Sequence, residues 1–153
     1  MSMQRLQNML LHLPFVLLCM AAVFKELQGQ PTYEDFKNRH MIGNTGLPGN
    51  TYGEKCTMGI ENRRIFIKKN NQQECKPINT FIIGDEQSIK DICKSKDNIL
   101  ICSSRKFDII ICRKNDDGVR LVSEGCKYKG ALQKRQVVVA CKDGLPVHFE
   151  RFC

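Results

Sequence analysis

The chain of 153 residues has nine cysteines, three histidines and a net charge of +8. The length suits one domain rather than two, and 42% hydrophobic with 26% charged residues excludes an intrinsically disordered chain. Three histidines argue against a multi-histidine metal site, and the absence of tryptophan argues against a wide platform for stacking bases. Nine cysteines indicate a disulfide scaffold or a metal protein, but an odd number leaves one thiol unpaired.

The N-terminal segment predicts a secretory signal peptide. Arg5 precedes an apolar run at residues 9–24, and small and polar residues follow the run. A single-pass membrane anchor is the alternative, but the run is shorter than the roughly 20 apolar residues of a spanning helix, and no later segment could span a bilayer. We place cleavage after Gly29, so that residues 1–29 are the signal peptide and residues 30–153 the mature domain.

Removal of residues 1–29 changes the counts. Cys19 and His12 leave with the signal peptide, so eight of the nine cysteines and two of the three histidines remain. Two basic residues and one acidic residue also leave, which lowers the net charge from +8 to +7. Eight cysteines behind a secretion signal predict disulfides in an oxidising compartment. Zinc sites need close pairs such as C-x-x-C, which the sequence lacks, so we expect no metal and no cofactor.

Helices are expected in the first part of the mature chain. Thr32 is followed by two acidic residues, which predicts a capped helix that runs to residue 41. Residues 43–53 are rich in Gly, Pro and Asn and predict a loop, and a second short helix is expected at residues 55–62. Asp85 can cap a third helix that ends at Cys93.

Strands follow, mostly in the second part of the chain. The strand-like runs lie at residues 65–68, 79–83, 99–103, 107–113, 119–123, 127–128, 136–141 and 146–149. Helices gathered early and strands gathered late predict an α+β fold with an antiparallel sheet.

The pairing of the eight cysteines is left open by the sequence, because on the order of a hundred pairings exist. One regularity is that joining the first four cysteines to the last four in order gives four loops of similar length, near 50 residues. Each such crosslink stabilises a fold by about 3–4.7 kcal/mol in the chain-entropy model. The pairs would be Cys56–Cys112, Cys75–Cys126, Cys93–Cys141 and Cys102–Cys153.

His40 and His148 are the first candidates for chemistry. His40 shares a helix face with Phe36, and His148 shares a strand face with Glu150, which could orient its ring. Histidine is the natural acid or base near neutral pH, and one protonated and one neutral ring form a general acid–base pair. A lone histidine is more often a structural or surface residue, so these residues do not by themselves establish a reaction.

Lys76 is the third candidate. It follows Cys75 directly, so a disulfide would fix its backbone, and a fixed ammonium group can stabilise charge that develops on a phosphate. The alternative is that Lys76 is one of many surface lysines.

Three blocks of sequence resemble the pancreatic ribonuclease A superfamily. Residues 75–81, CKPINTF, resemble its signature C-K-x-x-N-T-F. Residues 37–40, KNRH, are similar to the helix segment that ends in the N-terminal catalytic histidine, and residues 137–149 to the C-terminal catalytic block. The runs IKDIC and GLPVH, at residues 89–93 and 144–148, resemble angiogenins, so the likeness is closest to angiogenin-like and non-mammalian vertebrate members. It covers nearly the whole mature chain.

The resemblance implies a ribonuclease A-like fold with three short helices, a V-shaped antiparallel β-sheet and four disulfides. It implies metal-free cleavage of single-stranded RNA 3′ to pyrimidines, through a 2′,3′-cyclic phosphate that is then hydrolysed. His40 would be the general base, His148 the general acid and Lys76 the cation that stabilises the transition state. The substrate-binding residues would be Arg39, Asn79, Thr80, Phe149 and Glu150, of which Thr80 would read the pyrimidine edge and Phe149 would pack near the base.

The sequence departs from the family pattern at three places. Arg39 stands where the family commonly has Gln, and Glu150 stands where it usually has Asp; both changes bear on rate more than on the reaction. Three of the four suggested cysteine pairs match the family's shared disulfides. Cys102–Cys153 does not, but the fold would bring Cys102 near the C-terminus.

Basic residues cluster at residues 63–64, 68–69, 127–129 and 134–135. With the net charge of +7, they suit a polyanionic partner with salt-sensitive affinity. RNA is one such partner, and anionic bacterial surfaces, heparin-like glycans and a cell-surface receptor are others. Residues 63–64 fall near a nuclear-targeting stretch of angiogenins, which suggests nuclear entry. The leading hypothesis is a secreted, monomeric endoribonuclease, and the alternative is a secreted cationic signalling or host-defence protein with weak ribonuclease activity.

Overall fold

Helices begin at local side-chain caps in this computed structural model, which describes residues 29–153. Thr32 and Asp35 form a reciprocal capping box before α2 (Tyr33–His40), and Asp85 caps α4 (Glu86–Lys90), which continues into the 3₁₀ turn η1 (Asp91–Cys93). The expected signal peptide at residues 1–29 lies, apart from its last residue, outside the described residues.

Helix α3 (Tyr52–Asn62) begins three residues earlier than expected. Thr51 and Glu54 form a capping box there, within a segment whose Gly, Pro and Asn content predicted a loop. A cap of this kind stabilises a helix by about 1 kcal/mol, and it decides where the loop stops.

The larger sheet has the order β1-β4-β6-β7. Its antiparallel body consists of β4 (Ile78–Ile83), β6 (Phe107–Lys114) and β7 (Tyr128–Arg135), and the short β1 (Met41–Ile42) pairs with β4 in parallel. The expected antiparallel sheet is therefore confirmed in its body, and only the two-residue β1 pairs in parallel, where the chain leaves α2 and runs beside β4.

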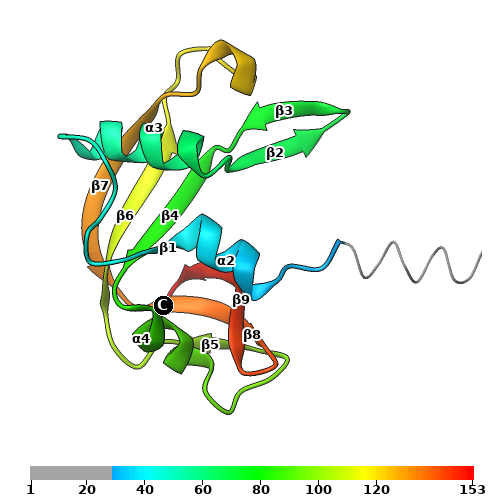
Figure 1. Cartoon of the computed structure of the whole chain (residues 1–153), viewed down its shortest axis with the longest axis vertical. Helices are drawn as coiled ribbons and strands as arrows, with labels where there is room; N and C mark the ends of the chain where they lie inside the picture. The colour runs from blue at the N-terminus through cyan, green and yellow to red at the C-terminus, as the bar shows by residue number, and fades with distance from the viewer. Residues whose placement is uncertain (1–28) are drawn as a thin grey trace, which may run out of the picture. The chain divides into compact units, whose positions relative to one another are not determined.

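The smaller sheet has the order β5-β8-β9 and is antiparallel. It consists of β5 (Ile99–Cys102), β8 (Val137–Lys142) and β9 (Leu145–Phe152). Figure 1 shows the two sheets as two arms, with α3 along the larger arm, α4 beside the smaller one and α2 between them. Helix α2 packs against β4 of one sheet and β9 of the other, so it joins the two arms.

The observed strands differ from the expected ones at three places in the chain. The expected strand at 119–123 is wrong: residues Val122–Glu124 form the 3₁₀ turn η2, because the Glu124 carboxylate accepts from backbone N–H groups of Arg120 and Leu121. Strand β7 is much longer than the expected 127–128. The prediction was too short because most residues of β7 are exposed and show no alternation of apolar and polar side chains. The polar hairpin of β2 (Phe66–Lys69) and β3 (Gln72–Cys75) turns at two asparagines with positive φ.

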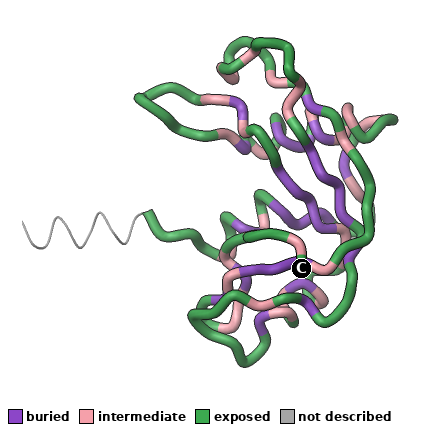
Figure 2. The backbone as a smooth tube through the Cα atoms, turned by 180° about the vertical axis from the view of Figure 1, so that it is seen from behind, coloured by how far each residue is buried: buried purple, intermediate pink, exposed green. Residues whose placement is uncertain are grey.

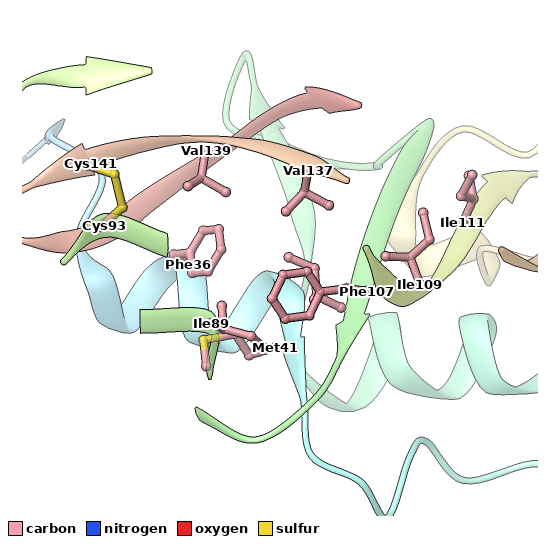
Figure 3. Close-up of a cluster of buried hydrophobic side chains, with 11 residues drawn as sticks. Phe36, Met41, Ile89, Cys93, Phe107, Ile109, Ile111, Val137, Val139 and Cys141 are labelled. Carbon is pink, nitrogen blue, oxygen red and sulfur yellow. A yellow bond between two sulfur atoms is a disulfide. The ribbon is translucent and has the colours of Figure 1, made fainter. Parts of the chain in front are cut away.

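The main core lies between α2, α4 and both sheets, and Figure 3 draws its side chains. In it Val137 and Val139 point from β8 towards Phe107 and Phe36. Phe36 of α2 is 1% exposed. The cluster consists of Phe36, Met41, Ile82, Ile89, Cys93, Phe107, Ile109, Ile111, Val137, Val139 and Cys141. A second cluster, between α3 and the other face of the larger sheet, contains Phe81, Ile110 and Tyr128. Figure 2 shows burial along the strands and exposure at the hairpin ends.

Four disulfides join Cys56 to Cys112, Cys75 to Cys126, Cys93 to Cys141 and Cys102 to Cys153. These are the pairs given by joining the first four cysteines to the last four in order. Residues 29–153 thus form an α+β fold, with three α-helices, mainly antiparallel sheets and four disulfides. Within residues 29–153, the helices are too short or too polar to cross a membrane.

Candidate active site

His40 is the last residue of α2 and lies in the region where α2 meets both sheets. Its ring is 5% exposed and lies between the rings of Phe36, at 5.3 Å, and Phe149, at 5.5 Å. Its Nδ1 is 2.8 Å from the carbonyl oxygen of Thr80. A carbonyl can only accept, so Nδ1 must carry a hydrogen, and in the neutral ring the lone pair is then on Nε2.

Burial is the main reason that the pKa of His40 is lowered, to about 3. The hydrogen bond to Thr80 opposes this effect, while the charges of Lys76, His148 and Arg39 add to it. The ring is therefore neutral at physiological pH. A neutral imidazole with a free Nε2 can accept a proton from a bound hydroxyl group.

Lys76 is held at both its backbone and its ammonium group. Cys75, the preceding residue, is disulfide-bonded, and the Tyr128 hydroxyl donates to the Lys76 carbonyl oxygen at 2.9 Å. Its Nζ donates to the Asn79 Oδ1 at 2.9 Å. Burial first, and then the charge of Arg39, lowers the pKa of Lys76 to about 8. The ammonium group is thus fixed beside a neutral partner and remains available to an anion.

Asn79 connects the lysine to helix α2. Its side chain is buried, accepts from Lys76 and donates through Nδ2 to the Arg39 carbonyl oxygen at 2.9 Å. The neighbouring Thr80 is also buried and provides the carbonyl that holds His40. Adjacent residues of β4 therefore position the lysine and the buried histidine.

His148 lies on β9 with the opposite exposure to His40. Its side chain is 56% exposed, and its Nε2 is 3.6 Å from the Glu150 Oε2. The two residues are two positions apart and lie on the same strand face, as their spacing predicted. Phe149, between them, packs on the core and contacts His40. One strand thus presents an exposed imidazole with its carboxylate partner on one side and an aromatic ring on the other.

The site as a whole is rich in positive charge. Arg39 is exposed at the end of α2, and among the ion pairs of the described residues none includes Arg39 or Lys76. Arg39, Lys76 and His148 all act electrostatically on His40, and Glu150 is paired with His148. Cations that surround a buried neutral base, with only the Glu150 carboxylate paired among these groups, are suited to binding an anion.

Two contributions to the site were not predicted. The Tyr128 hydroxyl holds the backbone of Lys76 from 52 residues away, and Phe152 packs against Phe149 at 5.5 Å. Neither residue lies in the sequence blocks that indicated the site, and no spacing rule connects them to it. Both contacts depend on strand pairing.

Comparisons with known proteins identify the family of this chain. The family model described as "Pancreatic ribonuclease" matches residues 31–150. Angiogenin-1 of Bos taurus is 31% identical over 127 residues, which cover 78% of this chain and 80% of angiogenin-1. Ribonuclease-like 3 of Danio rerio is 31% identical over 134 residues, with coverages of 80% and 83%. The crystal structure of green turtle egg white ribonuclease superposes with a TM-score of 0.65 at 26% identity, covering 79% of this chain and 98% of the turtle chain. The chain belongs to the pancreatic ribonuclease family.

Proposed function

We propose that this protein is a secreted endoribonuclease that cleaves single-stranded RNA on the 3′ side of pyrimidines without a metal ion. The observation that carries the proposal is the state of His40: a buried neutral ring, held by Thr80 through Nδ1, beside a group of cations. Such a ring can take a proton from the ribose 2′-OH while the cations hold the neighbouring phosphate.

In the first step, Nε2 of His40 takes the proton of the 2′-OH, and the 2′ oxygen attacks phosphorus. Protonated His148 gives its proton to the 5′ oxygen as the bond from phosphorus to that oxygen breaks. Lys76 stabilises the negative charge that accumulates on the phosphate oxygens. The product is a 2′,3′-cyclic phosphate, and water opens it with the two histidines in exchanged roles. DNA lacks the 2′-OH and is not cleaved.

Glu150 and Arg39 would act on this reaction from the rim of the site. The Glu150 Oε2 lies 3.6 Å from the His148 Nε2 and would orient the His148 ring. Arg39 is exposed and forms no ion pair among the described residues, and its charge lowers the pKa of Lys76, so the two cations would face the same bound anion. We assign it a contact with phosphate in place of the usual Gln.

Thr80 would select the pyrimidine. In a strand, the N–H and C=O of one residue point to the same side. The carbonyl of Thr80 accepts from His40, so its N–H also faces the site and not the neighbouring strand β6. An N–H donor next to a hydroxyl matches the O2 and N3 edge of a pyrimidine, and Phe149 provides an apolar surface for the base.

A cleavage assay on a pyrimidine-containing single-stranded RNA, with and without a chelator, tests the proposal. We expect unchanged cleavage with the chelator, and loss of about 10²–10⁴-fold in kcat for His40→Ala and His148→Ala. Lys94→Ala, an exposed lysine distant from the site in sequence, is the matched control and should keep full activity. Cleavage that persists at the wild-type rate in either histidine variant would show that the assignment is wrong.

A second candidate function, binding of extracellular polyanions, is favoured by the hairpin of β2 and β3. Lys68 and Lys69 are exposed on it, and the described ion pairs include neither. Arg63, by contrast, is held by the fold, since its Nη1 donates to the carbonyl oxygens of Asn38 and Met41. The double variant Lys68→Gln/Lys69→Gln should weaken binding to heparin-like glycans and leave RNA cleavage intact, whereas His148→Ala should do the reverse.

A further inference from the structure

Among the strands of residues 29–153, β9 has a neighbour on one side only. It lies at the edge of the β5-β8-β9 sheet, and its register with β8 shifts twice, on either side of the residues Val139 and Ala140 that oppose Phe149 and His148. Side chains alternate along a strand, so a slip of one residue would exchange the directions of Phe149 and His148. Contacts outside the β8–β9 ladder are therefore needed to keep the two rings in place.

The C-terminal end of β9 has such contacts. Cys153 is disulfide-bonded to Cys102 of β5, the opposite edge strand. The N–H of Cys153 donates to the Gln136 carbonyl oxygen at 3.3 Å. Cys102 and Phe152 pair with adjacent residues of β8, so the disulfide joins the two outer strands across the end of the central one. The guanidinium of Arg135 lies 5.1 Å from the centre of the Phe152 ring.

A row of aromatic rings leads from this end of β9 to His40. The Phe152 ring meets Phe149 edge-on at 5.5 Å, and Phe149 lies 5.5 Å from His40. Both phenylalanines are partly buried against the main core. The position of Phe152 therefore limits where Phe149, and through it the His40 ring, can lie.

The disulfide itself contributes little to the core. Cys102 and Cys153 are both exposed, whereas each of the other three disulfides includes at least one buried cysteine. Opening this bond removes no buried side chain. Loss of the disulfide would therefore change the position of β9 more than the packing of the core.

The geometry points to Phe152 and the Cys102–Cys153 disulfide as a positioning device for the reaction. Together they hold β9 in the register in which Phe149 contacts His40 and His148 faces the other way. The expected effect of this device on the reaction rate rests on the proposed function. The expected effect on the position of the His40 ring rests on the contacts alone.

The test uses residues 30–153, which contain the whole compact unit Thr32–Cys153 and only two histidines. The variants are Phe152→Ala and the double variant Cys102→Ser/Cys153→Ser, and the control is Leu132→Ala, which removes a 46% exposed apolar side chain from β7. The measurements are kcat and KM on a pyrimidine dinucleotide and the proton NMR signals of the two imidazole rings, assigned with His148→Ala.

Both variants should lower kcat about tenfold with less than about a twofold change in KM, since displaced groups cost rate more than binding. The His40 signal should shift as the Phe149 ring moves, Leu132→Ala should behave as wild type, and Phe152→Tyr should restore both readouts. Wild-type kcat and an unshifted His40 signal in both variants would overturn the inference. If wild type does not cleave RNA but the His40 signal shifts, the proposed function fails and the positioning stands.

Limited reduction keeps the test independent of how the variants fold. A small dithiol should open the exposed bond first, forming two protein thiols as the dithiol closes to its cyclic disulfide. Alkylation and mass mapping identify the opened pair. The His40 signal should then shift with an unchanged far-ultraviolet circular dichroism spectrum, and an unshifted signal after complete opening of Cys102–Cys153 would contradict the inference.

Discussion

Acidification should destabilise the fold through His40. Its ring is 5% exposed, and burial, with neighbouring positive charges, lowers its pKa to about 3 in the folded protein. In the unfolded chain the same ring has a pKa of about 6.5. Between these values the unfolded state binds a proton that the folded state does not, so the free energy of unfolding falls as the pH falls. Above pH of about 6.5 the ring is neutral in both states, and its contribution is complete.

The size of the effect follows from the two pKa values. Each unit of difference is worth about 1.4 kcal/mol, so His40 should remove about 2 kcal/mol of stability at pH 5 relative to pH 7, and about 4 kcal/mol near pH 3. This is a large share of the typical stability of a domain, which is about 5–15 kcal/mol.

The assay compares wild type with His40→Gln, whose amide can still donate to the Thr80 carbonyl but does not titrate. Urea unfolding with intact disulfides, followed by circular dichroism at pH 7 and pH 5, gives the free energy of unfolding of each protein. The carboxylates contribute equally to both proteins and cancel in the comparison. Wild type should lose about 2 kcal/mol more than His40→Gln. Equal losses would show that His40 titrates normally and that its burial does not control its charge.

Three further predictions concern the same group of residues. The pH profile of kcat/KM should be bell-shaped, with an acid limb below about pH 6.5 because the pKa of His40 is lowered; a flat profile from about pH 4 to 9 would contradict the paired histidines. Arg39→Gln removes a charge that lowers the pKa values of both His40 and Lys76, so it should move the acid limb to higher pH, while Lys94→Ala should not. Asn79→Ala leaves the ammonium group of Lys76 and the carbonyl of Arg39 without their hydrogen-bond partner. It should therefore lower the free energy of unfolding by about 2–4 kcal/mol in urea titrations. An unchanged urea midpoint would argue against a stabilising role for these two hydrogen bonds.

The local elements could be predicted because their causes are local. The caps at Thr32 and Asp85 bond to backbone N–H groups three residues later, so the helix starts can be recognised in a short segment. The strands of the two cores could be recognised for a similar reason, since β6 and β8 carry apolar residues that must be buried. Strand β2 was expected at residues 65–68, but strand β3 and most of β7 could not be predicted, because exposed polar strands leave no pattern and are defined by their partners.

The same distinction applies to the site. The amino-acid sequence by itself determined the family blocks, and with them the identity of His40, Lys76 and His148 as candidates. It also contained the order of cysteines from which one regular pairing followed. Only the tertiary structure decided the state of these groups. The pKa of His40 depends on burial between rings from α2 and β9, and its Nδ1 is held by a carbonyl 40 residues away. Desolvation and hydrogen bonding act through space, so residues that are distant in the chain set the charge of a ring whose position was already evident from the sequence.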